Sequence, residues 1–192
     1  MAQTSERRPF YWEQLSAKDI RKRSDQLAAL RSGINAEPGT VPAMWRFYTS
    51  SNEGRMLDAE HYTLTLFAIH QQSQSDLVHR ADVPIPSAIR KLHTEFEGRA
   101  RFNKEAVDRR FFAAVTAPEL REVAHHLRGL IRQIHSLPIP APFDYTRLFW
   151  DFTRWSAPEE RQRIQRRWGL GYYGAVAPDD PVATAQSQKG DA

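Results

Sequence analysis

Apolar side chains recur with the spacing of an α-helix along most of this chain, and segments that alternate like a β-strand are nearly absent. The clearest helical pattern has its apolar positions at Leu120, Val123, Ala124, Leu127, Leu130, Ile131 and Ile134. A repeat of about 3.6 residues places these side chains on one face of a helix. The pattern therefore predicts an all-α protein built from amphipathic helices.

Capping residues and prolines indicate where the helices begin. Asp58, Asn103 and Asp144 are candidate N-caps, because their side chains can accept a bond from the first helical turn. Thr116–Glu119 and Ser156–Glu159 have the pattern of capping boxes. The predicted helices cover residues 18–31, 58–74, 86–97, 103–115 and 116–135, followed by two that begin after residues 144 and 156. The helix after Asp58 is apolar on most sides, so we expect it to be the buried central helix.

Composition predicts how these helices are grouped. We expect a two-lobed helical bundle, with an N-terminal lobe at residues 1–97 and a basic C-terminal lobe at 98–174, divided near Gly98. Residues 136–142 contain three prolines and should form an extended linker. Residues 175–192 are rich in Pro, Asp, Gln and Ser, which predicts a disordered tail.

Two absences narrow the class of protein. The chain has no cysteine, which excludes disulfides, thiolate zinc sites and cysteine nucleophiles. It has no apolar run of the roughly 18 residues that a membrane-spanning helix needs, and Met1–Pro9 is too polar for a secretory signal. We expect a soluble, cytoplasmic protein with no membrane partner.

No catalytic motif is found. The histidines at 61, 70, 125 and 126 make no i, i+4 pair, and the sequence has no H-E-x-x-H, P-loop or G-x-S-x-G pattern. Gly169–Gly174 matches G-x-G-x-x-G, but an arginine-rich helical segment precedes it where a nucleotide site needs a strand. We predict no enzymatic activity, no cofactor and no metal. An enzyme with an unrecognised site at these histidines is a rival that the sequence does not support.

Positive charge is concentrated in the second half of the chain. The net charge is +4, and residues 98–174 carry 14 basic and 8 acidic residues, a balance of +6. Of the 27 basic residues, 22 are arginine, whose planar fork binds phosphate through two bonds. A GC-rich genome would enrich arginine as well, so the positions of the arginines must decide between the two explanations.

Those positions fall on helix faces. The predicted faces are Arg121, Arg128 and Arg132 beside His125, then Arg109 with Arg110, then Arg163, Arg166 and Arg167. A solvated face normally alternates the sign of its charges, because like charges one turn apart repel. Same-sign faces on three helices predict a surface that holds a nucleic-acid backbone.

Short segments of the chain also resemble a known family in their order and spacing. They are Leu27–Arg31, Glu37–Pro42, Glu60–His61, Thr65–Ser73, Glu105–Phe111, His126–Leu130, Phe143–Tyr145 and Arg166–Trp168. Together they resemble the CasB family, the small subunit of the type I-E CRISPR Cascade complex. The resemblance covers about residues 10–173.

This resemblance implies an all-helical, non-catalytic protein that is present as a pair of subunits in the ribonucleoprotein. Family members hold the guide RNA–target DNA assembly and the displaced DNA strand through basic residues. The positions carried over are Arg31, Arg109, Arg110, Arg128, Arg163, Arg166 and Arg167. Where many relatives have two consecutive basic residues, this chain has Ser32 after Arg31 and Gly129 after Arg128. Arg132, one turn later, is expected to substitute for the missing residue.

The sequence therefore predicts a nucleic-acid-binding subunit that grips backbone without reading bases. The predicted contact residues are Arg31, Arg109, Arg110, Arg121, Arg128, Arg132, Arg163, Arg166 and Arg167. The expected partners are CRISPR guide RNA, the target and displaced DNA strands, other Cascade subunits and a second copy of the chain. A structural adaptor whose arginines contact acidic protein partners is the alternative.

Overall fold

The computed structural model describes residues 8–16, 18, 23–49, 54–95, 103–139 and 141–174. Over these ranges all regular structure is helical, and the one β-type pairing is an isolated bridge between His79 and Phe143. This confirms the all-α prediction. The predicted tail at 175–192 and the predicted division at Gly98 lie outside the described residues.

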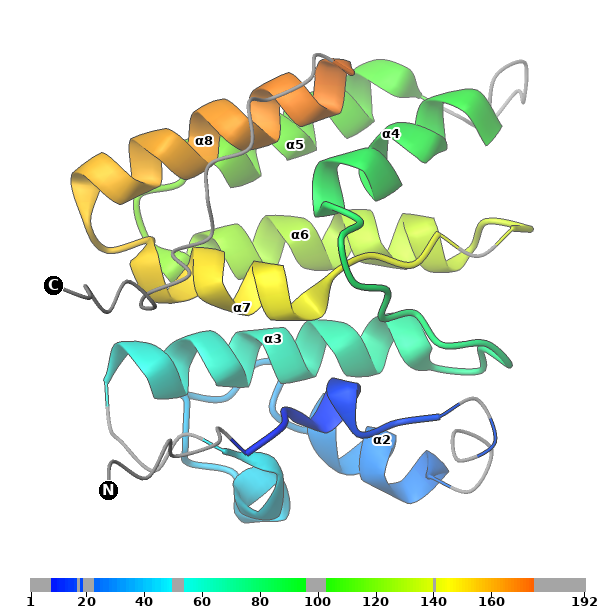
Figure 1. The fold of residues 1–192 in the computed structure, drawn as a ribbon, viewed down its shortest axis with the longest axis vertical. Helices are drawn as coiled ribbons and strands as arrows, with labels where there is room; N and C mark the ends of the chain where they lie inside the picture. The colour runs from blue at the N-terminus through cyan, green and yellow to red at the C-terminus, as the bar shows by residue number, and fades with distance from the viewer. Residues whose placement is uncertain are drawn as a thin grey trace, which may run out of the picture.

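The helices form stacked layers (Figure 1). They are η1 (Tyr11–Glu13), α2 (Ser24–Arg31), η2 (Pro42–Phe47), α3 (Arg55–Gln71), α4 (Ile85–Glu95), α5 (Lys104–Thr116), α6 (Leu120–His135), α7 (Tyr145–Arg154) and α8 (Pro158–Tyr173). In Figure 1, α3 crosses the molecule with α2, η1 and η2 on one side and α6 and α7 on the other, and α4, α5 and α8 lie beyond those. The α6 helix packs against both α3 and α5.

The α3 helix is the buried centre, as its apolar sequence predicts. Every residue from Ala59 to Gln71 is buried, because α2, α6 and α7 all pack on this helix. The helix begins at Arg55, three residues before the predicted cap. The Asp58 amide donates to the carbonyl of Gly54 at 3.1 Å, so Asp58 lies inside the first turn and Gly54, with φ of 91°, is the N-cap.

Two of the predicted N-caps are confirmed. The Asn103 side chain accepts a bond from the Ala106 amide at the start of α5. The Asp144 side chain accepts from the Arg147 amide at the start of α7. Each bond satisfies a donor that the first turn would otherwise leave unpaired.

The two predicted capping boxes are wrong. The Thr116 hydroxyl donates to the carbonyl of Phe112, so this side chain closes α5, and Glu119 is the N-cap of α6. The α8 helix has Ala157, the residue after Ser156, as its N-cap, without a side-chain bond. In α8 the proline of the pattern, Pro158, occupies the first helical position, so the helix starts one residue later than the box requires.

The buried apolar residues form one continuous cluster that includes side chains from η1 to α8. Three tryptophans are fastened inside it by indole N–H bonds: Trp12 to Thr146 Oγ1, Trp155 to the carbonyl of Ala117, and Trp168 to Asp151. The division into lobes 1–97 and 98–174 stays a prediction.

The glycine-rich segment lies in the last helix. Gly169 and Gly171 are helical residues of α8, and Gly174, with φ of 77°, ends the helix in the left-handed conformation. A helical backbone cannot form the phosphate-binding turn of a nucleotide site, which agrees with the earlier rejection of that motif. None of the helices in the described ranges is long and apolar enough to span a membrane.

Candidate nucleic-acid interface

The side chain of Arg110 reaches from α5 across the surface of α6. It lies against Gly129, where an added Cβ would stand 2.9 Å from Arg110 Cδ and 3.2 Å from Cζ. Any other residue at position 129 would therefore have to displace this arginine. Gly129 thus leaves room for the guanidinium of Arg110 at the position that follows Arg128.

Two histidines lie beside this arginine on α6. The rings of His125 and His126 are 5.4 Å apart. Burial lowers the pKa of His126, and the neighbouring His125 and Arg110 lower it further, while Glu122 acts in the opposite direction. Arg110 of α5 and the two histidines of α6 therefore share one neighbourhood, with Glu122 next to it.

The same surface continues along α6 to Arg128 and Arg132. Burial and the positive charge of Arg132 lower the pKa of Arg128. Arg132 is exposed, and neither it nor Arg110 has a hydrogen bond or ion pair within the described residues. We call this group the α5–α6 surface: Arg110, His125, His126, Arg128 and Arg132.

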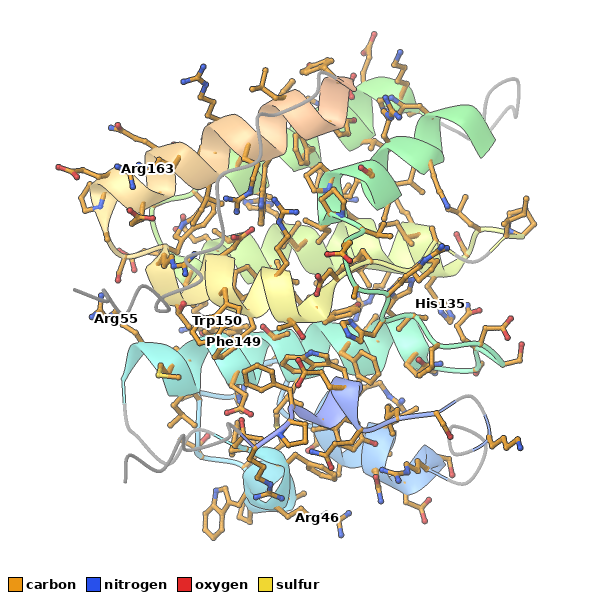
Figure 2. All side chains as sticks on the ribbon, in the orientation of Figure 1. Arg46, Arg55, His135, Phe149, Trp150 and Arg163 are labelled. Carbon is orange, nitrogen blue, oxygen red and sulfur yellow. The ribbon has the colours of Figure 1, made fainter. Side chains whose placement is uncertain are left out.

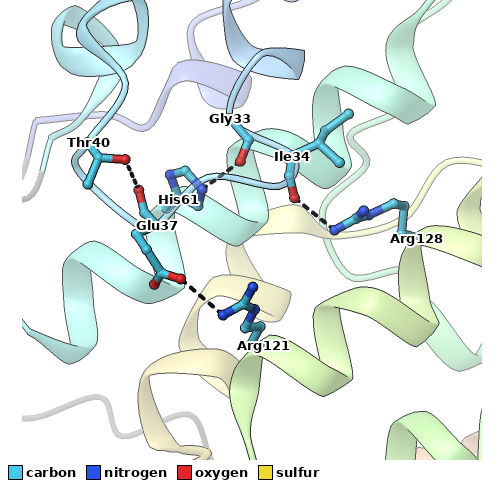
Figure 3. Close-up of polar contacts among 7 residues, drawn as sticks. All are labelled: Gly33, Ile34, Glu37, Thr40, His61, Arg121 and Arg128. Carbon is cyan, nitrogen blue, oxygen red and sulfur yellow. Dashed lines mark hydrogen bonds and ion pairs between the residues drawn. The ribbon is translucent and has the colours of Figure 1, made fainter.

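Arg128 also has a structural contact (Figure 3). Its Nη1 donates to Asn35 Oδ1 at 2.9 Å, and its Nη2 donates to the carbonyl of Ile34 at 2.8 Å. These two hydrogen bonds connect α6 to the loop after α2. Both acceptors are neutral, so neither of them compensates the positive charge of Arg128.

Other predicted arginines pair with local acids. Arg121 Nη1 lies 3.0 Å from Glu37 Oε1 on that same loop (Figure 3). Arg109 Nη1 lies 3.7 Å from Glu105 Oε2, one turn earlier on α5, and both side chains are largely exposed. Exposed pairs of this kind contribute little to stability, so phosphate can compete for Arg109.

The predicted same-sign face on α8 is wrong. Arg167 turns inward and donates to Asp151 Oδ1, and its side chain is only 17% exposed. Arg163, on the outer side of α8 (Figure 2), donates to Glu160 at 2.8 Å. Of the three, only Arg166 is exposed without a partner in the described part of the chain. The core explains the difference, since a buried carboxylate at Asp151 needs a counter-charge.

Arg31, the last residue of α2, lines a cleft of about 440 Å³. Its other lining residues are Ser24, Leu27 and Gln71–Ser75. The hydroxyl and amide groups of this cleft can bond to sugar or phosphate oxygens, and Arg31 is the charge at its edge. The sequence pattern gave no sign that the end of α3 would meet Arg31.

The central histidines have structural partners. His61 Nδ1 lies 2.7 Å from the Tyr48 hydroxyl, and its Nε2 lies 3.0 Å from the carbonyl oxygen of Gly33. Burial lowers the pKa of His70 to about 3, and its Nδ1 lies 3.1 Å from the Tyr145 hydroxyl. No group of three potential metal ligands occurs among the residues that the structure describes.

Comparisons with known proteins give one family. The profile of the family described as CRISPR-associated protein Cse2 matches residues 26–173. CasB from Thermobifida fusca has a TM-score of 0.60 and 23% identity, covering 82% of this chain and 93% of that one. A Cse2-family protein from Thermus thermophilus has a TM-score of 0.61 and 20% identity, covering 87% and 100%. CasB from M. ruber has a TM-score of 0.59 and 20% sequence identity, and the match covers 86% of this chain and 94% of that one. These likenesses show the shared fold. A search of curated proteins found no match.

Proposed function

The chain belongs to the CRISPR-associated Cse2 (CasB) family, a subunit of the Cascade complex, and we propose that it is the non-catalytic, nucleic-acid-binding small subunit of that complex. In this role it holds the backbone of the guide RNA, the target DNA and the displaced strand in a type I-E complex in the cytoplasm. It works there beside the other Cascade subunits and a second copy of itself. Base pairing by the guide supplies the sequence recognition.

The α5–α6 surface is the observation that carries this proposal. Arg110 and Arg132 are positive groups without an ion pair in the described residues, and Arg128 has only neutral acceptors. Grouping like charges costs free energy in the free protein, and a polyanion laid along them removes that cost. Arginine also suits this role because its fork can donate two bonds to one phosphate.

The ion pairs divide the predicted contact residues into two groups. Arg167 pairs with the buried Asp151, so its first role is structural. Arg121 and Arg163 stand closer to an acid of the same chain, at 3.0 and 2.8 Å, than Arg109 does at 3.7 Å, so they are less available to phosphate. The residues that remain best placed to meet phosphate are Arg31, Arg109, Arg110, Arg128, Arg132 and Arg166. This set is smaller than the sequence predicts, and it lies on α2, α5, α6 and α8.

The proposal is tested in the assembled complex with the double variant Arg110→Ala/Arg132→Ala. We expect the complex to assemble normally while the displaced strand loses its protection from nucleases. The matched control is Arg80→Ala/Arg154→Ala, which removes the same charge from exposed positions outside the predicted set. Loss of assembly with unchanged strand protection in the surviving complex would contradict the proposal and support the structural adaptor.

A further inference from the structure

Two aromatic side chains lie exposed where α8 ends beside α5. Phe112 on α5 is 44% exposed and Tyr173 on α8 is 68% exposed. Their ring centres are 6.5 Å apart, and the ring planes differ by 30°. Contiguous exposed apolar surface with a polar rim is typical of an interaction site.

A buried second layer supports these rings. Phe111 and Tyr172, the chain neighbours of the exposed pair, are buried and stack with centres 4.0 Å apart. The Tyr172 hydroxyl donates to Asp108 Oδ1 at 2.5 Å and lies 2.9 Å from His93 Nε2. These contacts connect the end of α8 to α4 and α5. The exposed rings of Phe112 and Tyr173 therefore stand next to a well-packed layer.

The charges around the rings favour an anionic partner. Arg109 precedes Phe112 by one turn, Arg166 precedes Tyr173 by two turns, and Arg90 lies against Gly174, the residue after Tyr173. Two acids lie on α5 near them. Glu105 is paired with Arg109, and Asp108 is bonded to Tyr172. The exposed rings therefore have cations beside them and acids that already have partners.

We propose that Phe112 and Tyr173 form a stacking platform for unpaired bases of a single-stranded nucleic acid. The inference rests on the proposed function and adds to it, because a backbone grip alone accepts paired and unpaired strands. Stacking needs the face of a base, which a duplex does not offer. Arg109, one turn from Phe112, joins the platform to the α5–α6 surface, so phosphates can follow the arginines while bases lie on the rings.

The test uses the full chain at low ionic strength and two fluorescent probes. One is an oligothymidylate of about a dozen nucleotides, within the usual site sizes for single strands, and the other is an abasic oligonucleotide of equal length and charge. We expect the wild type to bind the thymidylate more tightly than the abasic probe. The variant Phe112→Leu/Tyr173→Leu should bind the thymidylate about tenfold more weakly, and the abasic probe as the wild type does.

Controls separate the failure of this inference from the failure of the proposed function. Ile139→Ala changes another exposed apolar residue, 57% exposed, and should bind both probes as the wild type does. Arg110→Ala/Arg132→Ala should lose affinity for both probes equally. If the leucine variant and the wild type bind both probes alike, the platform is wrong and the backbone grip stands. If the wild type binds neither probe, both proposals fail.

A crosslinking experiment locates the contact directly. Irradiation of a 5-iodouracil oligonucleotide bound to the wild type should attach it to a peptide that contains Phe112 or Tyr173. Crosslinks found only elsewhere would overturn the platform. A second outcome would also overturn the platform. If Phe112→Leu/Tyr173→Leu kept its affinity for DNA but failed to assemble with other complex subunits, the rings would be a protein contact.

Discussion

The buried carboxylate of Asp151 binds Arg167 and so turns it away from the binding surface that the sequence predicts on α8. The Asp151 side chain is 5% exposed, and burial raises its pKa while Arg167 and Trp168 lower it. Both carboxylate oxygens are taken, one by Arg167 and the other by the Trp168 indole at 2.8 Å. Arg167 is therefore held inward as the counter-charge of a buried carboxylate.

This arrangement predicts unequal costs for two acidic residues on neighbouring helices. Asp151→Ala leaves a buried guanidinium and a buried indole N–H without partners, so it should lower the free energy of unfolding by about 3–5 kcal/mol. Glu160→Ala removes the exposed partner of Arg163 and should cost less than about 1 kcal/mol. Urea unfolding of the two variants measures the difference, and equal costs would contradict the structural role of Arg167.

At the scale of helices and loops, Arg128 has two roles that can be separated. Its fork fastens α6 to Ile34 and Asn35, while its charge belongs to the α5–α6 surface. Arg128→Ala should speed amide hydrogen exchange in residues 33–40, because that loop loses two bonds, and should leave the rest of α6 unchanged. Arg132→Ala, with no partner among the described residues, is the matched control and should leave the loop as it is. Unchanged exchange in both variants would show that the fork does not hold the loop.

Helix positions could be predicted from the sequence better than helix starts. The 3.6-residue pattern located α6 because Val123, Leu127, Leu130 and Ile134 all face the core. Asn103 was recognisable as a cap because its side chain bonds within four residues along the chain. Thr116–Glu119 fits a capping box equally well as a pattern, but the Thr116 hydroxyl bonds backwards to the preceding helix. Sequence spacing alone does not distinguish these two bonds.

At the scale of the whole molecule, the contact surface was only partly predictable. Helical spacing identified Arg110 and Arg132 as outward-facing, since a face depends only on positions within one helix. The partners of Arg121 and Arg128 come from the loop after α2, more than 80 residues earlier in the chain. The pairing of α5 with α8, which brings Phe112 beside Tyr173, is another such long-range contact. No pattern within a single helix can predict these contacts.

The central claim is that phosphates lie along the α5–α6 surface, and the salt dependence of binding tests it most directly. If about six phosphates are contacted, the logarithm of the binding constant for single-stranded DNA should fall with log salt at a slope of about −4, or −0.7 per contact. Arg110→Ala/Arg132→Ala should make that slope shallower by about 1.4. A wild-type slope near zero, or an unchanged slope in the variant, would contradict the claim.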